Sequence, residues 1–264
     1  MRWVVGDIHG MIRPLEMLLR AVERKDSSAE LLFVGDYVNR GPDSRGVIEL
    51  LLSLKNAHFV RGNHDDVFDQ VLCGQSFAGK PGEEQRVLAF KWFMQHGLER
   101  TFHSYGVSPR ELTNIFRRAS DKSLDDLASS IPTEHRKFIR KLPVVIERDD
   151  LFVAHAKWEV TLGADDPPIS QRLDGSELTR YNLLWGRYRM DELEYDKPWS
   201  RTGYFGHTPV GNYLDDDDLV PVVGPRIVLL DTAAALVMHG RLTAYCHENA
   251  SFIQVDASGK IVVK

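Results

Sequence analysis

The sequence predicts an α/β fold with a largely parallel core sheet and a helical insertion. In the first third of the chain, short apolar runs that are typical of buried strands alternate with amphipathic, helix-like segments. Such an alternation indicates right-handed βαβ units. From residue 66 to about residue 142, helix-like segments follow one another with no strand pattern between them. We therefore expect one domain over residues 1–264, in which residues 66–142 form an insertion beside the functional site and shape access to it.

The first third is expected to form strand, helix, strand, helix and strand. Pro14 stands at the start of the first helix, where its missing N–H costs no hydrogen bond. Asp43 or Ser44 can cap the second helix by accepting a hydrogen bond from a free backbone N–H. In chain order, the five expected elements are Trp3–Val5, Pro14–Val22, Leu31–Val34, Val47–Leu52 and His58–Arg61.

The rest of the chain combines the insertion with further β-like runs. Asp149 and Asp150 separate the runs Pro143–Arg148 and Leu151–His155, which predicts a tight hairpin. A short strand is expected at Tyr204–Phe205, and the alternating runs after it indicate a second, more antiparallel sheet. The expected helices of the insertion are Glu84–Gln95, Pro109–Ala119, Leu124–Ser130 and Thr133–Leu142, and the β runs of the tail are Ile227–Asp231, Leu242–Cys246, Ser251–Val255 and Ile261–Val263.

The composition narrows the class of protein. The chain has 38 acidic and 33 basic residues and a net charge of −5, which argues against a protein that coats nucleic acid. It has no polybasic cluster for a membrane surface and no apolar stretch near the ~20 residues that span a bilayer. The first strand starts at Arg2 and leaves no room for a signal peptide, and Cys73 and Cys246 form no C-x-x-C motif. We expect a cytoplasmic protein.

Five of the apolar runs end in side chains that bind metal ions. Ligand sites in open α/β sheets lie beyond the strand ends, where loops from separate strands converge. Any one of these residues alone would more often be a cap or a turn residue, but five strand ends in succession indicate a shared site. Carboxylate, amide and imidazole groups together form a set of oxygen and nitrogen ligands that suits manganese, iron or zinc. A structural zinc site would instead be expected to use thiolates. The predicted ligands are Asp7, His9, Asp36, Asn63, His155 and His207.

The neighbouring residues suggest a reaction at this site. Asp36 is the natural bridge between two ions, because a carboxylate has two oxygens. Two divalent ions ~3.5–4 Å apart can bind phosphate oxygens and generate an attacking hydroxide between them. His64 follows the predicted ligand Asn63 and keeps a free imidazole, which can protonate a leaving alkoxide. Arg40 and Arg187 can each hold phosphate oxygens in a bidentate way.

These motifs resemble the phosphoprotein phosphatase branch of the calcineurin-like metallophosphoesterases. The resemblance is greatest to the compact bacterial and bacteriophage serine/threonine phosphatases, whose Trp-x-Arg element is similar to Trp185-Gly186-Arg187. The residues Leu230–Ala234 and Gly240–Ala244 extend the similarity toward the C terminus. The motifs that carry the resemblance are Gly-Asp-Ile-His-Gly from Gly6, Gly-Asp-Tyr-Val-Asn-Arg-Gly from Gly35, Gly-Asn-His-Asp from Gly62, His155, and Gly-His-Thr from Gly206.

The resemblance implies a four-layer α/β/β/α sandwich with a two-metal centre between its sheets. The cofactors would be two divalent ions, manganese first, with iron and zinc as alternatives. The resemblance makes His64 the general acid and Arg40 and Arg187 the phosphate clamps. It assigns Asp7, His9 and Asp36 to one ion, and Asp36, Asn63, His155 and His207 to the other.

Two positions depart from related patterns. Nuclease-like relatives carry Gly-His-x-His, and here the last slot is Pro209, which argues against a nuclease. Protein phosphatases have an aspartate where this chain has Asn39, and in the family that aspartate pairs with the acid histidine and raises its pKa. Asparagine accepts a hydrogen bond but carries no charge that would stabilise an imidazolium. We therefore include Asn39 with His64 among the catalytic residues and expect His64 to be less basic than in relatives.

Two substrates fit such a centre. The first prediction is a serine/threonine protein phosphatase that also accepts phosphotyrosine, favoured by the Trp-x-Arg element and the compact tail. The alternative is a symmetrical dinucleoside tetraphosphate hydrolase, favoured by Asn39, since a nucleotide is a better leaving group than an alkoxide. Other small phosphoesters would also fit, and a non-catalytic binding protein on the same fold is the third hypothesis, although none of the six ligands is missing. We expect no nucleic-acid or membrane partner, and the sequence gives no oligomeric state.

Overall fold

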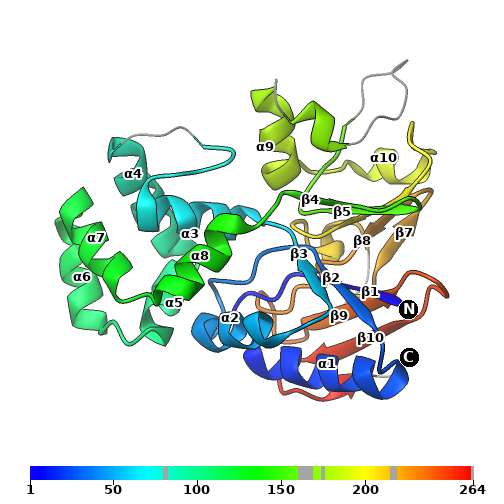
Figure 1. Cartoon of the computed structure of the whole chain (residues 1–264), viewed down its shortest axis with the longest axis horizontal. Helices are drawn as coiled ribbons and strands as arrows, with labels where there is room; N and C mark the ends of the chain where they lie inside the picture. Colours follow the sequence, from blue (N-terminus) through cyan, green and yellow to red (C-terminus); the bar gives the residue numbers. More distant parts are fainter. Residues whose placement is uncertain (80–82, 160–168, 174–175, 215–218, 263–264) are drawn as a thin grey trace.

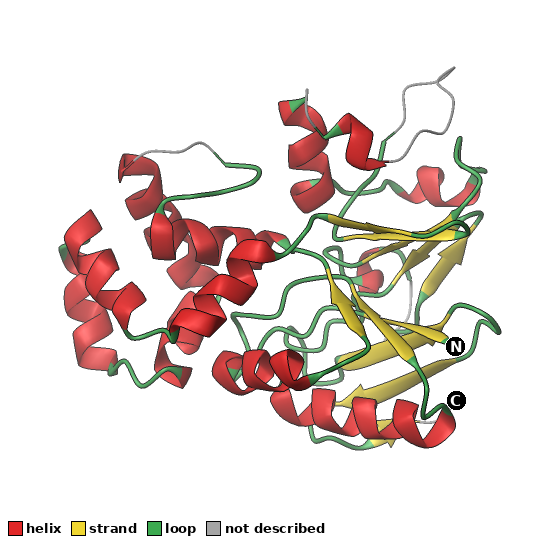
Figure 2. Ribbon diagram, viewed as in Figure 1, coloured by secondary structure: helices red, strands yellow, loops and turns green. Residues whose placement is uncertain are grey.

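Two β-sheets stacked face to face form the centre of the molecule, and helices cover the outer face of each sheet. The computed structural model describes residues 1–79, 83–159, 169–173, 176–214 and 219–262. Figures 1 and 2 show the order of the layers: α1 and α2 below one sheet, the second sheet above it, and α9 and α10 on top. The predicted α/β sandwich is therefore confirmed.

The first sheet has six strands in the order β11-β10-β9-β1-β2-β3. β1, β2 and β3 are parallel, as the βαβ pattern predicts, whereas β9 lies antiparallel to β1 and continues through β10 to β11. Their bounds are β1 (Arg2–Val5), β2 (Glu30–Phe33), β3 (Ala57–Phe59), β9 (Arg241–Cys246), β10 (Phe252–Asp256) and β11 (Ile261–Val262). Val263, the last residue of the expected final strand, lies outside the described residues.

The second sheet has five strands in the order β4-β5-β6-β8-β7. β5, β6 and β8 are parallel, and β4 and β7 are antiparallel strands at the two edges. The predicted hairpin is confirmed, since β4 and β5 pair across Asp149 and Asp150. The bounds are β4 (Val145–Glu147), β5 (Leu151–Ala154), β6 (Thr202–Phe205), β7 (Val222–Gly224) and β8 (Ile227–Leu229).

The expectation that the tail forms a second, antiparallel sheet is wrong for three of its four runs, since only the first of them, β8, joins the second sheet. β9, β10 and β11 extend the first sheet, where Val4 of β1 lies opposite Tyr245 of β9. The edge of β1 that faces away from β2 was available for pairing, and an antiparallel strand can use it. Alternation of apolar residues predicts strands in the tail, but it does not indicate with which other strands they pair.

Alternating side chains along the strands divide the core into three layers. Trp3 and Val5 of β1 belong to the cluster beneath the first sheet, whereas Val4 belongs to the cluster between the sheets. In β5, Val153 faces the first sheet and Phe152 faces the helices above. Both faces of these strands are buried, so the strands read as continuous apolar runs rather than as an apolar and polar alternation. Each fully buried large apolar side chain contributes about 1.5–3 kcal/mol to stability.

Four helices cover the sandwich and six lie in the region of the predicted insertion, within the described part of the chain. α1 packs on β9 and β10, and Asp43 caps α2 by accepting a hydrogen bond from the N–H of Gly46 at 2.8 Å. The covering helices are α1 (Ile12–Lys25), α2 (Ser44–Ser53), α9 (Glu177–Trp185) and α10 (Met190–Glu194). The others are α3 (Asn63–Cys73), α4 (Glu83–Phe93), α5 (Leu98–Ser104), α6 (Pro109–Arg117), α7 (Asp121–Ser129) and α8 (Thr133–Lys141), with 3₁₀ turns η1 (Met94–His96), η2 (Ile169–Arg172) and η3 (Val210–Asn212).

Helices α3 to α8 gather at one end of the sandwich (Figure 1). α3 is in contact with α4, α7 and α8 and starts at Asn63, three residues before the expected insertion boundary. Two predicted site residues, Asn63 and His64, therefore form the first turn of a helix rather than a loop. None of the described helices has both the length and the apolar character that crossing a membrane requires.

Candidate metal centre

All six predicted ligands follow the ends of strands and converge at one place. Asp7 and His9 follow β1, Asp36 follows β2 and Asn63 follows β3, while His155 and His207 follow β5 and β6 of the other sheet. Each of the six is at most 9% exposed. The site therefore lies where the carboxyl ends of parallel strands from both sheets meet.

Several of these residues hold strained backbone conformations. His9, Asp36 and His207 have φ angles of 48°, 56° and 65°, in the left-handed region that non-glycine residues avoid. Asn39 and Arg40, on the loop after Asp36, share this region with φ of 74° and 65°. Such residues gather at functional sites because the surrounding structure holds them there at a cost in stability.

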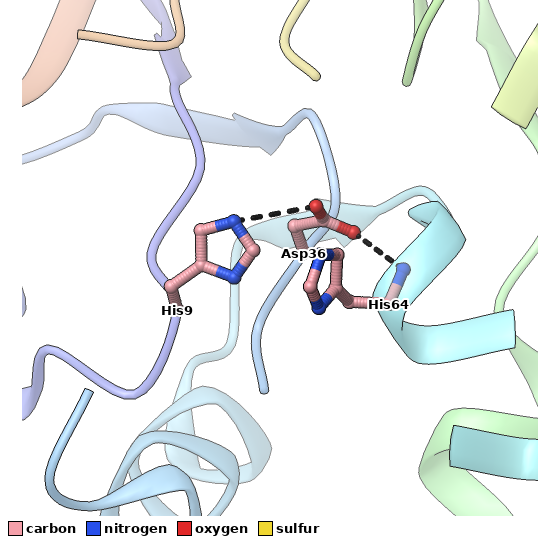
Figure 3. A group of neighbouring side chains, drawn as sticks. All are labelled: His9, Asp36 and His64. Atoms are coloured by element: carbon pink, nitrogen blue, oxygen red, sulfur yellow. Dashed lines mark hydrogen bonds and ion pairs between the residues drawn. The ribbon is translucent and has the colours of Figure 1, made fainter. Parts of the chain in front are cut away.

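Asp36 lies between two histidines. One of its oxygens, Oδ2, is 3.4 Å from Nε2 of His9, and the other, Oδ1, is 3.5 Å from Nε2 of His155. Oδ1 also accepts a hydrogen bond from the backbone N–H of His64 at 2.9 Å. Figure 3 shows the Asp36 carboxylate between His9 and the start of α3. The two oxygens thus face two separate groups of donors, which suits a bridging ligand.

Hydrogen bonds to the backbone orient two of the imidazoles. Nδ1 of His9 donates to the carbonyl of Val38 at 2.9 Å, and Nδ1 of His155 donates to the carbonyl of Val34 at 2.8 Å. When Nδ1 carries the proton, Nε2 of a neutral imidazole has a free lone pair. Metal-binding histidines commonly have this arrangement, in which a backbone carbonyl fixes the tautomer.

The spacing of Asn63, His155 and His207 fits a metal ion. Oδ1 of Asn63 is 2.9 Å from Nε2 of His155 and 3.1 Å from Nδ1 of His207. Since Nδ1 of neutral His155 carries the proton, its Nε2 lone pair faces an amide oxygen, and no hydrogen bond joins them. Donor atoms bound at about 2.1 Å and at right angles around one ion lie about 3 Å apart. These three donors therefore have the spacing of ligands around one cation.

The carboxyl groups of the site also favour a bound cation. Burial raises the pKa of Asp36 to about 7 and that of Asp7 well above its ordinary value, and the charge of Asp231 adds to both shifts. Burial lowers the pKa of His155 to about 4 and that of His9 well below its ordinary range. Neutral imidazoles beside carboxylates that resist ionisation make a site short of positive charge, which divalent ions would supply.

Two sets of three candidate metal ligands occur at the site, and within each set the ligand atoms lie within 4.8 Å of one another. One set is His9, Asp36 and His64, and the other is Asp7, Asp36 and His155. Asp36 belongs to both sets. Asp7 is held beside His207, whose backbone N–H donates to Asp7 Oδ2 at 3.0 Å. The described residues therefore contain candidate ligands for two ions that share Asp36.

His64 lies beside Asn39, but the Asn39 amide donates to the imidazole, whereas the sequence predicts that it accepts. Nδ2 of Asn39 donates to Nδ1 of His64 at 2.9 Å, while Oδ1 of Asn39 accepts from the hydroxyl of Thr101 at 2.8 Å. In this arrangement the proton of a neutral His64 lies on Nε2. Burial, and then the nearby charges of His9 and Arg40, lower the pKa of His64 well below its ordinary value.

The two arginines differ in their placement. Nη1 of Arg40 lies 2.5 Å from Nε2 of His9. The positively charged guanidinium therefore lies where a metal ion bound to His9 would lie. Arg187 is exposed, and its Nη1 donates to Oγ1 of Thr208 at 3.2 Å, one residue beyond His207. Arg40 therefore contacts a predicted metal ligand directly, and Arg187 contacts the residue that follows one.

Sequence reasoning missed three buried residues of this site. Asp65 accepts hydrogen bonds from the N–H groups of Asp36 at 2.8 Å and Tyr37 at 3.0 Å, and so positions the bridging loop. Thr101, from α5, orients the amide of Asn39. The two residues are 62 positions apart in the sequence, and no local pattern predicts such a contact. Asp231 could have been found, since it follows the apolar run of β8 as the other ligands follow their strands.

The chain is similar over almost its whole length to tetraphosphatases. It is 25% identical to the asymmetrical bis(5'-nucleosyl)-tetraphosphatase PrpE of Oceanobacillus iheyensis, over 96% of this chain and 90% of the relative. It is 43% identical to the symmetrical bis(5'-nucleosyl)-tetraphosphatase of Coxiella burnetii, but only over 63 residues, which are 24% of this chain and 22% of the relative.

Solved structures with the same fold include enzymes of two kinds. A structure described as a candidate diadenosine tetraphosphatase is 27% identical, with a TM-score of 0.55 over 96% of this chain and 92% of the other. A cold-active protein tyrosine phosphatase has a TM-score of 0.53 over 99% and 77%, at 16% identity, and shows the fold alone.

The family description that matches the sequence is "calcineurin-like phosphoesterase", over residues 2–240. This match includes all six strand-end donors, from Asp7 to His207, and Asp231. The chain therefore belongs to the calcineurin-like phosphoesterase family, whose chemistry is the metal-dependent hydrolysis of phosphoric esters.

Proposed function

We propose that this chain hydrolyses a phosphoanhydride bond of dinucleoside tetraphosphates with two divalent metal ions. The observation that carries the proposal is the 2.9 Å contact between the Asn39 amide and His64. An uncharged partner gives the imidazole little help in staying protonated, which suits a leaving group that needs little protonation. A nucleotide leaves through a phosphate oxygen, which is a far weaker base than a serine alkoxide.

The relatives support the same substrate class. Two relatives that match over almost the whole chain are named asymmetrical bis(5'-nucleosyl)-tetraphosphatases. The sequence-based preference for a protein phosphatase thus has less support than its alternative. Which anhydride bond is cut is a separate question, because the named symmetrical relative matches over 63 residues only.

We assign the ions as follows. Asp7, His9 and Asp36 hold one ion, and Asp36, Asn63, His155 and His207 hold the other. The free Nε2 lone pairs of His9 and His155 and the two-sided position of Asp36 support this assignment. When bound, the two ions, for which manganese is our first choice and iron or zinc the alternatives, supply Lewis acidity to the phosphate and activate a water molecule.

The remaining residues handle the phosphates and the proton. The Nε2–H of neutral His64 donates a hydrogen bond to the leaving phosphate oxygen, and Asn39 keeps the proton on Nε2 by donating to Nδ1. Arg187 reaches a phosphate oxygen from the loop beside His207. Arg40, whose Nη1 contacts Nε2 of His9, would instead contact the phosphate chain when His9 holds an ion, since two cations cannot share that position.

A serine/threonine protein phosphatase is the second candidate. The observation that favours it is Arg187, which follows Trp185 as in the Trp-x-Arg element and lies beside His207 through Thr208. The same metal ligands and the same acid would serve a phosphomonoester. The two candidates therefore differ in the leaving group and in what surrounds the metal centre, rather than in the centre itself.

Replacing the shared ligand tests the site. We expect Asp36→Ala to bind less than one metal ion per chain and to lose hydrolysis of diadenosine tetraphosphate by at least about 10³-fold, since both ions share this carboxylate. Metal content would be measured by plasma emission spectroscopy and products by ion-exchange chromatography. Two ADP molecules would indicate symmetrical cleavage, and ATP with AMP asymmetrical cleavage. Wild-type hydrolysis in Asp36→Ala would refute the assignment.

A further inference from the structure

Side chains of α4 and α9, two helices labelled in Figure 1, line an open aromatic groove beside the metal centre. Large apolar side chains are exposed along it: Leu88 is 57%, Trp92 52% and Tyr181 51% exposed. Its volume is about 460 Å³, within the range of small-molecule sites. We call this the aromatic groove and define it by Ser76, Gln85, Leu88, Trp92, Tyr181 and Trp185.

At most one aromatic ring lies between the side chains of the groove and the two site residues His64 and His207. Trp92 and Trp185 are stacked, with ring centroids 5.7 Å apart and an interplanar angle of 20°. The Trp185 ring contacts His207 edge-on at 6.2 Å. On the other side Trp92 contacts Phe93 at 5.1 Å, and Phe93 contacts His64 at 4.9 Å. A molecule whose phosphate lies at the metal centre could therefore reach these indole rings with its next group.

The wall of the groove is anchored to the helix that carries His64. Asp66 of α3 accepts hydrogen bonds from the hydroxyl of Ser76 at 2.6 Å and from the N–H of Phe77 at 2.7 Å. Arg61 donates to the same carboxylate at 2.8 Å, and all three hydrogen bonds of this anchor are at least partly buried. The Ser76 side of the groove is thus held against α3, the helix that carries His64.

We propose that the aromatic groove binds a purine base of the substrate, with Trp92 and Tyr181 as the stacking surfaces and Gln85 at the edge of the base. This inference rests on the proposed dinucleotide substrate. Exposed aromatic faces bind bases by stacking, which is worth about five- to 150-fold in affinity per base. Gln85 is exposed at the rim, and a side-chain amide both donates and accepts, as adenine requires at N7 and N6.

A second pocket of about 520 Å³, lined in part by Lys157, Glu192 and Tyr195, is the competing place for a base. Its lysine is already paired, since Nζ of Lys157 lies 3.0 Å from Glu192 and 2.5 Å from Glu159. No stacked ring pair connects that pocket to His64 or His207 among the contacts of the described residues. Tyr195, which is 68% exposed there, provides a matched aromatic control.

The test compares two substrates that share a four-phosphate chain. For each manganese-loaded protein, kcat/KM on diadenosine tetraphosphate is divided by kcat/KM on inorganic tetrapolyphosphate, which has no base. We expect this ratio to fall about tenfold or more in Trp92→Ala and in Tyr181→Ala, and to recover in large part in Trp92→Tyr, which keeps an aromatic face. Tyr195→Ala should leave the ratio as in the wild type. Circular dichroism confirms that each variant is folded.

An unchanged ratio in both groove variants would overturn the inference, as would a fall in Tyr195→Ala alone. A wild type that does not cleave the dinucleotide would refute the proposed function instead. In that case, the binding of adenosine alone tests whether the aromatic groove binds a base. We expect adenosine to quench tryptophan fluorescence saturably in the wild type and not in Trp92→Ala. Absence of quenching in the wild type would refute the base site whatever the enzyme hydrolyses.

Discussion

In the proposed mechanism, the uncharged side chain of Asn39 sets the acidity of His64. The residue is fully buried, and its amide is held from one side by Thr101 and reaches His64 on the other. A carboxylate in this position would favour the imidazolium through its charge, whereas the amide can only fix the tautomer. Leaving groups of low basicity are affected least by this difference.

The first prediction at the residue scale concerns Asn39→Asp. We expect kcat on a phosphoserine peptide to rise about three- to tenfold and kcat on p-nitrophenyl phosphate to change less than about twofold, because only the alkoxide needs a strong proton donor. Steady-state kinetics of the two manganese-loaded proteins on both substrates measures this. Equal changes on both substrates would show that the charge at this position does not act through His64.

The second prediction at this scale concerns the metal-free protein. The pKa of Asp36 is raised by burial to about 7 from an ordinary 3.8. A carboxyl group with a raised folded pKa adds stability below the unfolded value, and this stability is lost as the pH rises through the folded value. Asparagine does not titrate. We therefore expect metal-free Asp36→Asn to melt higher than metal-free wild type at pH 8, by at least about 3 °C, and this advantage to shrink toward pH 5.

Thermal unfolding in EDTA from pH 5 to pH 8 measures the difference. Saturating manganese should reverse the order at pH 8, since the wild type then gains the binding energy of the ions. A difference between the two proteins that stays constant over this pH range would mean that Asp36 is not the strained carboxylate we take it to be.

At the scale of elements, glycines let the strand ends approach one another closely. A Cβ at Gly206, at the end of β6, would lie on Oδ1 of Asp7, and one at Gly62 would meet Oδ1 of Asp36 at 2.1 Å. Neither position has a positive φ, so the requirement for glycine is one of space. The close approach brings the carboxylates of one sheet against the backbone of the next strand end.

Gly206→Ala should therefore push the Asp7 carboxylate out of place. We expect at least about a tenfold loss of manganese affinity, measured by isothermal titration calorimetry, in a protein that keeps its circular dichroism spectrum. Gly211→Ala is the matched control, because its new Cβ would meet only a methyl group of Leu219 at 3.3 Å. Unchanged affinity in Gly206→Ala, or the same loss in the control, would contradict this account of the strand ends.

Elements that touch the site were predictable where a local signal existed. The strands before Asp7, Asp36 and His155 follow from short apolar runs, and the residues that follow them could be named in advance. The pairing of β9 with β1 could not, since nothing in the tail specifies its partner. Helix α9, which carries Trp185, was also missed, although Ser176 caps it by accepting from the N–H of Thr179.

At the scale of the whole molecule, the site exists because two sheets stack with their strand ends together. Asp7 and His207 are 200 residues apart, yet the backbone of one binds the carboxylate of the other. The residue types at strand ends predicted this convergence. Contacts such as that of Thr101 with Asn39 depend on how the helices at the end of the sandwich pack, and helical periodicity gives the buried face of a helix but not its neighbour.

The measurement that tests the account most directly is kcat/KM of the manganese-loaded protein on diadenosine tetraphosphate and on a phosphoserine peptide, side by side. The account predicts a preference of at least about 100-fold for the dinucleotide, since the peptide leaves as an alkoxide that His64 protonates poorly without a charged partner. A preference for the peptide would contradict it, and would make the chain a protein phosphatase in which Asn39 serves the acid as well as an aspartate does.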